Sequence, residues 1–128
     1  MRLQLSDPVK AAIASGKPVV ALETTLIAHG IPKPGNLKLA HQLEADVRDA
    51  GATPATIAIM DGVVKIGLEA DALSRLASAD DVEKVSTGAM AAAIARETIG
   101  ATTVASTAYL AALAGIRFRP VTPSRDCL

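Results

Sequence analysis

A carboxyl side chain stands directly after a predicted buried strand. Residues 17–22 form a short apolar run that is rich in β-branched residues, and Glu23 follows it. Ligands of α/β sheets bind at the carboxyl ends of the strands, and a carboxyl group shielded from water there favours its protonated form and suits a general acid. The alternative role is structural, because Glu23 could cap a neighbouring helix or pair with a lysine. Position alone favours this structural role.

Hydroxyl side chains follow two of the predicted strands. Thr24 and Thr25 come after Glu23, and the segment Thr102–Thr107 ends one strand and opens the next helix. Hydroxyl and N–H groups at a helix N-terminus can bind an anion or a sugar. Threonines also satisfy the backbone groups of loops, and Ser106 or Thr107 could serve only as a helix N-cap. The residue types alone leave both interpretations open.

One lysine lies inside a predicted strand. Lys84 belongs to the alternating segment 82–86, where Val82 and Val85 flank it. Its ammonium group either extends to solvent or binds an anion such as a phosphate, and the spacing favours neither outcome.

The best-known site motifs do not occur in the sequence. There is no GxxxxGK[ST], GxGxxG, GxSxG or HExxH pattern, so nucleotide-binding loops, serine-hydrolase elbows and zinc-protease sites find no support. The two histidines, His29 and His41, are twelve residues apart and form no known ligand pattern. We therefore expect no metal site made by this chain alone.

Strand-like and helix-like segments alternate along the chain, and they must position these residues. Apolar periodicity, capping residues and glycine stops predict helices over residues 7–14, 36–50, 68–76, 87–99 and 107–114, and strands over 17–22, 55–60, 63–66, 82–86 and 102–106. The dipeptide Asp61-Gly62 predicts a hairpin between two of the strands. Short connections between alternating strands and helices predict a three-layer α/β/α fold with a mainly parallel sheet.

Composition excludes several classes of protein. Thirteen Lys and Arg residues balance thirteen Asp and Glu residues, so the zero net charge gives no attraction for nucleic acid or anionic lipid. No apolar run is long enough for a membrane span or a signal peptide, and a single cysteine, Cys127, argues against disulfides; we expect a cytoplasmic protein. Tyr109 and Phe118 are the only aromatic residues, so the core is thin and we expect a homo-oligomer.

The regular pattern ends near residue 118. Each earlier helix stop is followed by a strand, and Gly115–Phe118 should begin another one. Residues 119–128 instead show no periodicity and contain two prolines, which central strands exclude. We therefore divide the chain into residues 1–118, one α/β unit, and residues 119–128, an irregular tail that is either a loose terminus or a foreign end produced by a frameshift or a premature stop.

Three blocks of sequence resemble pseudouridine-5'-phosphate glycosidases, also called the indigoidine synthase A-like family. The blocks are Val19–Pro32 (VVALETTLIAHGIP), Gly51–Ile59 (GATPATIAI) and Gly100–Thr107 (GATTVAST), the last continuing through Leu110–Ile116. Their order and spacing agree with the family, and the resemblance extends from about Pro18 to Ile116.

The resemblance implies an enzyme that reversibly cleaves the carbon–carbon glycosidic bond of pseudouridine 5'-phosphate to uracil and ribose 5-phosphate. Such a family opens the ribose ring with a glutamic acid as proton donor and uses a lysine as covalent nucleophile, together with a divalent metal, usually manganese. Glu23 corresponds to the proton donor, and Lys84 and Val104 correspond to substrate contacts. We count Thr25 and Thr103, which adjoin these positions, as further substrate-binding residues.

The sequence also departs from the family. Thr87–Met90 replaces the charged residues that commonly follow the Lys-Val-Ser triplet, and the Gly-rich, metal-binding and nucleophilic-lysine regions have no counterpart in residues 1–128. We therefore expect no turnover by this chain alone and assign no metal ligand in it; the implied assembly is a trimer. Alternatives are a related C-glycosidase of pigment biosynthesis, a non-catalytic sugar-phosphate-binding or assembly module, and a fragment that barely folds because its sheet exposes an edge.

Overall fold

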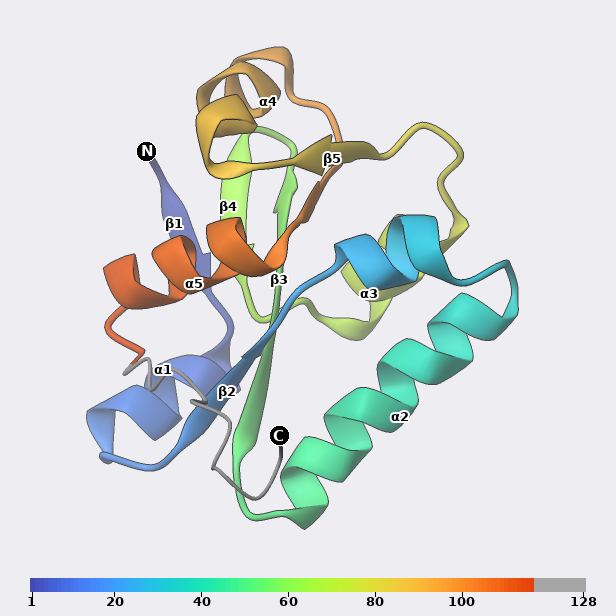
Figure 1. The fold of residues 1–128 in the computed structure, drawn as a ribbon. Helices are drawn as coiled ribbons and strands as arrows, with labels where there is room; N and C mark the ends of the chain where they lie inside the picture. The colour runs from blue at the N-terminus through green and yellow to red at the C-terminus, as the bar shows by residue number, and fades with distance from the viewer. Residues whose placement is uncertain (117–128) are drawn as a thin grey trace, which may run out of the picture.

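A computed structural model describes residues 1–116 and shows a single sheet covered by helices on both faces (Figure 1). Its strands are β1 (Leu3–Leu5), β2 (Val19–Leu22), β3 (Thr53–Met60), β4 (Val63–Ile66), β5 (Glu83–Val85) and β6 (Gly100–Thr102). Its helices are α1 (Asp7–Ala14), α2 (Gly35–Asp49), α3 (Ala70–Ser78), α4 (Met90–Arg96) and α5 (Val104–Leu113), with a π-helical turn η1 (Leu26–Gly30) and a 3-10 turn η2 (Thr87–Ala89).

The sheet has six strands in the order β1-β4-β3-β6-β5, and β2 also pairs with β3. Three pairings are parallel (β1 with β4, β2 with β3, β5 with β6) and two are antiparallel (β3 with β4 and with β6). The predicted three-layer α/β fold is confirmed, with a sheet that is mixed. The Asp61-Gly62 turn joins β3 to β4 as predicted, and both residues have the positive φ that such a turn requires (56° and 75°).

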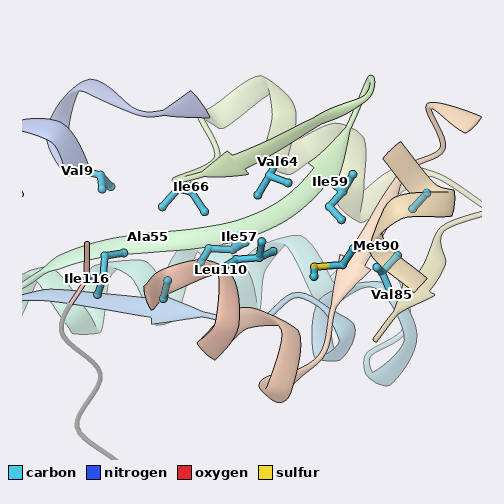
Figure 2. Close-up of a cluster of buried hydrophobic side chains, with 12 residues drawn as sticks. Val9, Ala55, Ile57, Ile59, Val64, Ile66, Val85, Met90, Leu110 and Ile116 are labelled. Carbon is cyan, nitrogen blue, oxygen red and sulfur yellow. The ribbon is translucent and has the colours of Figure 1, made fainter. Parts of the chain in front are cut away.

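Buried side chains form one cluster on each face of the sheet. Because successive side chains of a strand point to opposite faces, Ile57 and Ile59 of β3 join one cluster and Ala58 and Met60 join the other. Figure 2 shows the first cluster, which packs under α1, α4 and α5. The second cluster packs under α2, α3 and η1. Residues of β3 that are buried on both faces read as one apolar run, as the sequence indicated.

Several element boundaries differ from the predictions. The predicted strand over 102–106 is wrong: β6 ends at Thr102, and α5 begins at Val104. Thr103 is the N-cap of α5 and forms a capping box with Ser106, so the helix starts although Thr and Val favour strands. The predicted helix over 87–99 ends at Arg96, because Glu97 adopts the left-handed conformation (φ 54°). Strand β1 was not predicted from the sequence.

The structure describes one of the two aromatic residues, Tyr109, and only the start of the predicted C-terminal segment. Tyr109 is 45% exposed on α5 and so adds little to the core, which is built from aliphatic side chains. The predicted strand start at 115–118 lies partly outside the described residues, and the predicted tail over 119–128 lies wholly outside them. Among the helices of residues 1–116, none is long and apolar enough to cross a lipid bilayer.

We predict that Gly100→Ala destabilises the fold. A Cβ at Gly100 would lie 2.6 Å from Cγ2 of Val85 and 3.5 Å from Cβ of Ile59, and both neighbours are fully buried. Overpacking of this kind costs about 1–3 kcal/mol of unfolding free energy. Thermal or urea unfolding measures the loss. Gly88→Ala is the matched control, because a Cβ there meets nothing within 4 Å and should leave stability within about 0.5 kcal/mol. Equal stabilities of the two variants would contradict the packing argument.

Candidate active site

Strands β2 and β6 meet end to end along one edge of β3. Strand β2 runs parallel to the first half of β3 and stops at Leu22, opposite Thr56, whereas β6 runs antiparallel to the second half and stops at Thr102. Their carboxyl ends therefore point toward each other across Ile57, the residue of β3 between the two pairings. This arrangement brings together two strand ends of the kind that α/β proteins use for ligand sites.

Threonine hydroxyls close the gap at this junction. The backbone carbonyl of Ile57 accepts hydrogen bonds from Thr24 Oγ1 (2.8 Å) and from Thr102 Oγ1 (2.9 Å). Thr24 Oγ1 in turn accepts from the Thr102 N–H (2.8 Å), and Thr102 Oγ1 accepts from Thr107 Oγ1 (2.8 Å). Because Thr24, Thr102 and Thr107 are buried, each of these polar groups needs such a partner.

Further bonds fix the turn after Glu23 to the end of β6. The carbonyl oxygen of Thr102 accepts from the Thr24 N–H (3.1 Å) and from Thr25 Oγ1 (2.9 Å). A carboxylate oxygen of Glu23, Oε2, accepts from the Thr25 N–H (3.0 Å). The half-buried Glu23 side chain is thus held at the strand junction by its own turn, not by a lysine.

A groove of about 980 Å³ opens at this junction. Glu23 and Val104 both line it, and it continues along β2 between α1 and α5. Val104 is the first residue of α5 and is 72% exposed, which is unusual for valine and makes it accessible to a ligand.

Two further predicted site residues, Thr25 and Thr103, lie next to Thr102, and each hydroxyl makes its own hydrogen bond. The Thr25 hydroxyl donates to Thr102, and the Thr103 hydroxyl accepts the Ser106 N–H (3.2 Å) as the N-cap of α5. Ser106 Oγ also donates to the carbonyl of Val85 (2.8 Å), which joins α5 to β5. The alternative that Ser106 or Thr107 is the N-cap is wrong, since Thr103 has that role and Ser106 is its capping-box partner.

Lys84 is connected to this region through the sheet and not through the groove. It lies opposite Ala101 in the β5–β6 pairing, next to the Val85–Thr102 pair, and its side chain is exposed. His29 Nε2 donates to the carbonyl of Val82 (2.7 Å), so η1, which follows Glu23, is fixed to the start of the Lys84 segment. The structure therefore groups Glu23, Thr25, Thr103 and Val104 around Thr102 and places Lys84 one strand away.

The buried side-chain amide of Asn36 is hydrogen-bonded to η1. Asn36 Nδ2 donates to the carbonyls of Ile27 (3.1 Å) and Ala77 (2.7 Å), while Asn36 Oδ1 accepts from the Leu37 N–H (2.9 Å). This side chain, only 2% exposed, joins η1, α2 and α3. The helix predicted over residues 36–50 starts one residue earlier, at Gly35, so Asn36 lies inside the first turn of α2.

Two carboxyl groups have pKa values below their usual range, and both belong to surface ion pairs. Hydrogen bonds from Arg75 to both oxygens of Asp61 (2.8 Å each) lower the pKa of the Asp61 carboxyl. The ammonium group of Lys33, which donates to Asp80 at 2.6 Å, lowers the pKa of the Asp80 carboxyl. Exposed pairs of this kind contribute little to stability, and none of these residues lines the groove.

The described residues do not provide a metal site. Within residues 1–116, no three His, Cys, Asp or Glu side chains gather closely enough to hold an ion. The manganese ion that the resemblance implies therefore has no fitting ligand set in this part of the chain, and we assign no catalytic step to it.

The threonine network is the part of the site that sequence reasoning missed. The sequence drew attention to Thr24 and Thr102, but as ligand or loop hydroxyls and not as partners of each other. Two Thr-Thr pairs, Thr24-Thr25 after one strand and Thr102-Thr103 at the end of another, were the available signal. The two pairs become hydrogen-bond partners only because both strands pair with β3, which the sequence did not predict.

The comparisons with known proteins agree with this α/β fold. The family model of the Indigoidine synthase A like protein matches residues 8–120, and the chain belongs to this family. Curated proteins named pseudouridine-5'-phosphate glycosidase are 54% identical over 112 residues in Streptomyces griseus and 56% identical over 114 residues in a Jannaschia species. The chain spans only 35% and 38% of the length of these relatives, and the match corresponds to their N-terminal part.

Two solved structures share the fold. One is the prealnumycin C-glycosynthase AlnA in complex with ribulose 5-phosphate, which is 39% identical, with a TM-score of 0.81 over 91% of this chain and 37% of that one. The other is an indigoidine synthase A-like protein from Thermotoga maritima, which is 27% identical, with a TM-score of 0.75 over 91% of this chain and 38% of that one.

We predict that Thr102→Val lowers stability by about 1–3 kcal/mol, because the nearly isosteric side chain removes a donor to Ile57 and the acceptor of the Thr107 hydroxyl. Thr102→Ser keeps the hydroxyl and should restore most of the loss. Thr87→Val is the control, since Thr87 is exposed on η2. Urea unfolding measures all three variants, and a serine variant as unstable as the valine variant would contradict the hydrogen-bond explanation.

Proposed function

We propose that this chain is the N-terminal part of an enzyme that reversibly cleaves the carbon–carbon glycosidic bond of pseudouridine 5'-phosphate, giving uracil and ribose 5-phosphate. The observation that carries the proposal is the position of Glu23 beside Val104 at the mouth of a groove, where two strand ends meet. Relatives of that name at 54–56% identity support the choice of reaction.

In this proposal Glu23 is the proton donor that opens the ribose ring. A carbon–carbon glycosidic bond has no oxygen leaving group, so protonation must act on the sugar ring instead. The Glu23 carboxyl group gives its proton to the ring oxygen, which keeps the electron pair of its bond to the anomeric carbon as that bond breaks. The anomeric carbon forms a new bond to the amine nitrogen of the nucleophilic lysine, which the remainder of the complete enzyme supplies. The Thr25 N–H, which is bonded to Glu23 Oε2, then holds the resulting carboxylate in place.

The remaining residues bind the substrate. Val104 offers an exposed apolar contact at the groove. The hydroxyls of Thr25 and Thr103 already take part in protein hydrogen bonds, and their remaining lone pairs accept from ribose hydroxyls. Lys84 contributes a positive charge for the phosphate. We further propose that the complete enzyme is a cytoplasmic homotrimer and that its divalent metal, manganese, is bound by residues other than those described here.

A related C-glycoside reaction is the second candidate. The similarity to AlnA favours it, because that protein is a C-glycosynthase and was crystallised with ribulose 5-phosphate. Both candidates use a pentose phosphate, so the two reactions differ in the aglycone and not in the sugar site. Screening uracil against other aromatic aglycones with an active assembly distinguishes them.

We predict that the chain binds ribose 5-phosphate and that Lys84→Ala weakens binding about tenfold or more, because a charge-assisted hydrogen bond contributes about 1.5–3 kcal/mol. Isothermal titration calorimetry measures the affinity. Lys10→Ala is the matched control: Lys10 is also exposed but lies on α1, whereas Lys84 lies on β5 next to the Val85–Thr102 pair. Equal weakening by both substitutions would show that general charge, and not a site, binds the phosphate.

We predict that the chain by itself does not form pseudouridine 5'-phosphate from uracil and ribose 5-phosphate in the presence of manganese. The reason is that it spans only 35–38% of its curated relatives. Chromatography with mass detection measures the product, and the full-length Streptomyces griseus relative is the positive control. Product above background with this chain would contradict the prediction and assign the whole reaction to these residues.

A further inference from the structure

Side chains from η1 and the loop after it hold the connection that leads into β5. Residues 79–82, which join α3 to β5, form neither helix nor strand. At the end of this connection, His29 Nε2 in η1 donates to the Val82 carbonyl (2.7 Å). At its start, Lys33, three residues after η1, donates to the Ser78 carbonyl (2.8 Å). One segment of the chain therefore fixes both ends of the connection.

The turn η1 is also fixed to the candidate active site. The Thr24 carbonyl accepts from the Ala28 N–H (3.0 Å), so η1 is bonded to the threonine network. The buried Asn36 amide donates to a carbonyl inside the same turn. Glu23 immediately precedes Thr24 and lines the groove. His29 thus lies on a turn whose position is set by the strand end that carries Glu23.

Lys84 faces the side of the sheet that η1 covers. Successive side chains of a strand point to opposite faces. Glu83 pairs with Arg96 of α4 (3.2 Å), and Val85 belongs to the cluster under α1, α4 and α5. Lys84, which stands between them in β5, therefore points to the opposite face, where Val82 packs against the cluster under α2, α3 and η1. The carbonyl that η1 holds lies two residues before this lysine.

Strand β5 is short and lies at the edge of the sheet, so its position depends on the segment before it. It has three residues and is the last strand in the sheet order. Directly after Val82, the Glu83 N–H donates to the Ile99 carbonyl (2.9 Å). Because a lysine side chain is flexible, the place of its ammonium group depends on the backbone that carries it. A contact that fixes Val82 therefore also sets where Lys84 stands.

We propose that His29 is a positioning residue for the substrate phosphate: through the Val82 carbonyl it sets the place of Lys84 relative to the strand end that carries Glu23. The inference rests on the proposed function, in which Lys84 binds the phosphate and Glu23 is the acid. A ligand that contacts both groups needs a fixed distance between them, and the hydrogen bond from η1 to the β5 segment supplies that constraint. His29 itself neither touches the substrate nor transfers a proton.

Calorimetry of ribose 5-phosphate binding to the full chain tests the proposal. His29→Leu removes the donor and should weaken binding about threefold, less than Lys84→Ala does, because the lysine is displaced but keeps its charge. His29→Gln should keep the wild-type affinity, since its amide Nε2 is a donor the same number of bonds from the backbone. In a Lys84→Ala background, His29→Leu should have no further effect. His41→Leu, at the exposed histidine of α2, is the matched control and should bind as the wild type does.

Hydrogen exchange gives a readout that needs no ligand. The Glu83 amide, which is bonded to the Ile99 carbonyl, should exchange faster in His29→Leu and at the wild-type rate in His29→Gln. Thermal unfolding checks that the variants stay folded. Equal exchange rates in the wild type and both variants would overturn the positioning role, whether or not ribose 5-phosphate binds.

The binding outcomes distinguish a failure of this role from a failure of the proposed function. A leucine variant that binds as tightly as the wild type, a glutamine variant as weak as the leucine variant, or losses that add to that of Lys84→Ala would overturn the role of His29 alone. If Lys84→Ala leaves the affinity unchanged, the phosphate contact of the proposed function is refuted, and the positioning of that lysine for a phosphate is refuted with it.

Discussion

The structure depends on one constraint, which is that two strands of opposite direction share a single edge of β3. Where they meet, neither strand can supply a backbone partner to the carbonyl of Ile57, and a buried carbonyl without a partner is costly. The hydroxyls of Thr24 and Thr102 supply it. Side chains therefore complete a hydrogen-bond pattern that backbone groups complete elsewhere in the sheet, and they fix the two strand ends to each other.

This junction explains why the candidate site lies where it does. The carboxyl end of β2 brings Glu23, and the carboxyl end of β6 leads into α5 through Thr103 and Val104. Each hydrogen bond that aligns the strand ends also sets the distance between the acid and the first turn of α5. The same bonds use most of the hydroxyl donors, so among the described residues the ionisable side chains that line the groove are Glu23 and Lys17.

The groove beside Glu23 follows strand β2. The groove that Glu23 shares with α5 is bounded by a strand edge that has no neighbour among the described residues, and the relatives are more than twice as long as the matched part. The neutral net charge and the exposed Val104 are consistent with a small-molecule site.

The sequence by itself determined the α/β class, the hairpin at Asp61-Gly62 and the strand-end position of Glu23, because periodicity, turn residues and apolar runs are local signals. It misplaced the start of α5, since the β-branched Thr102–Val104 run favours a strand and only the capping box at Thr103 reverses that preference. The antiparallel β6 and the threonine network were decided by the tertiary structure alone. Their physical reason is nonlocal: Thr24 and Thr102 become partners only because Ile57, distant from both in sequence, offers them the same carbonyl oxygen.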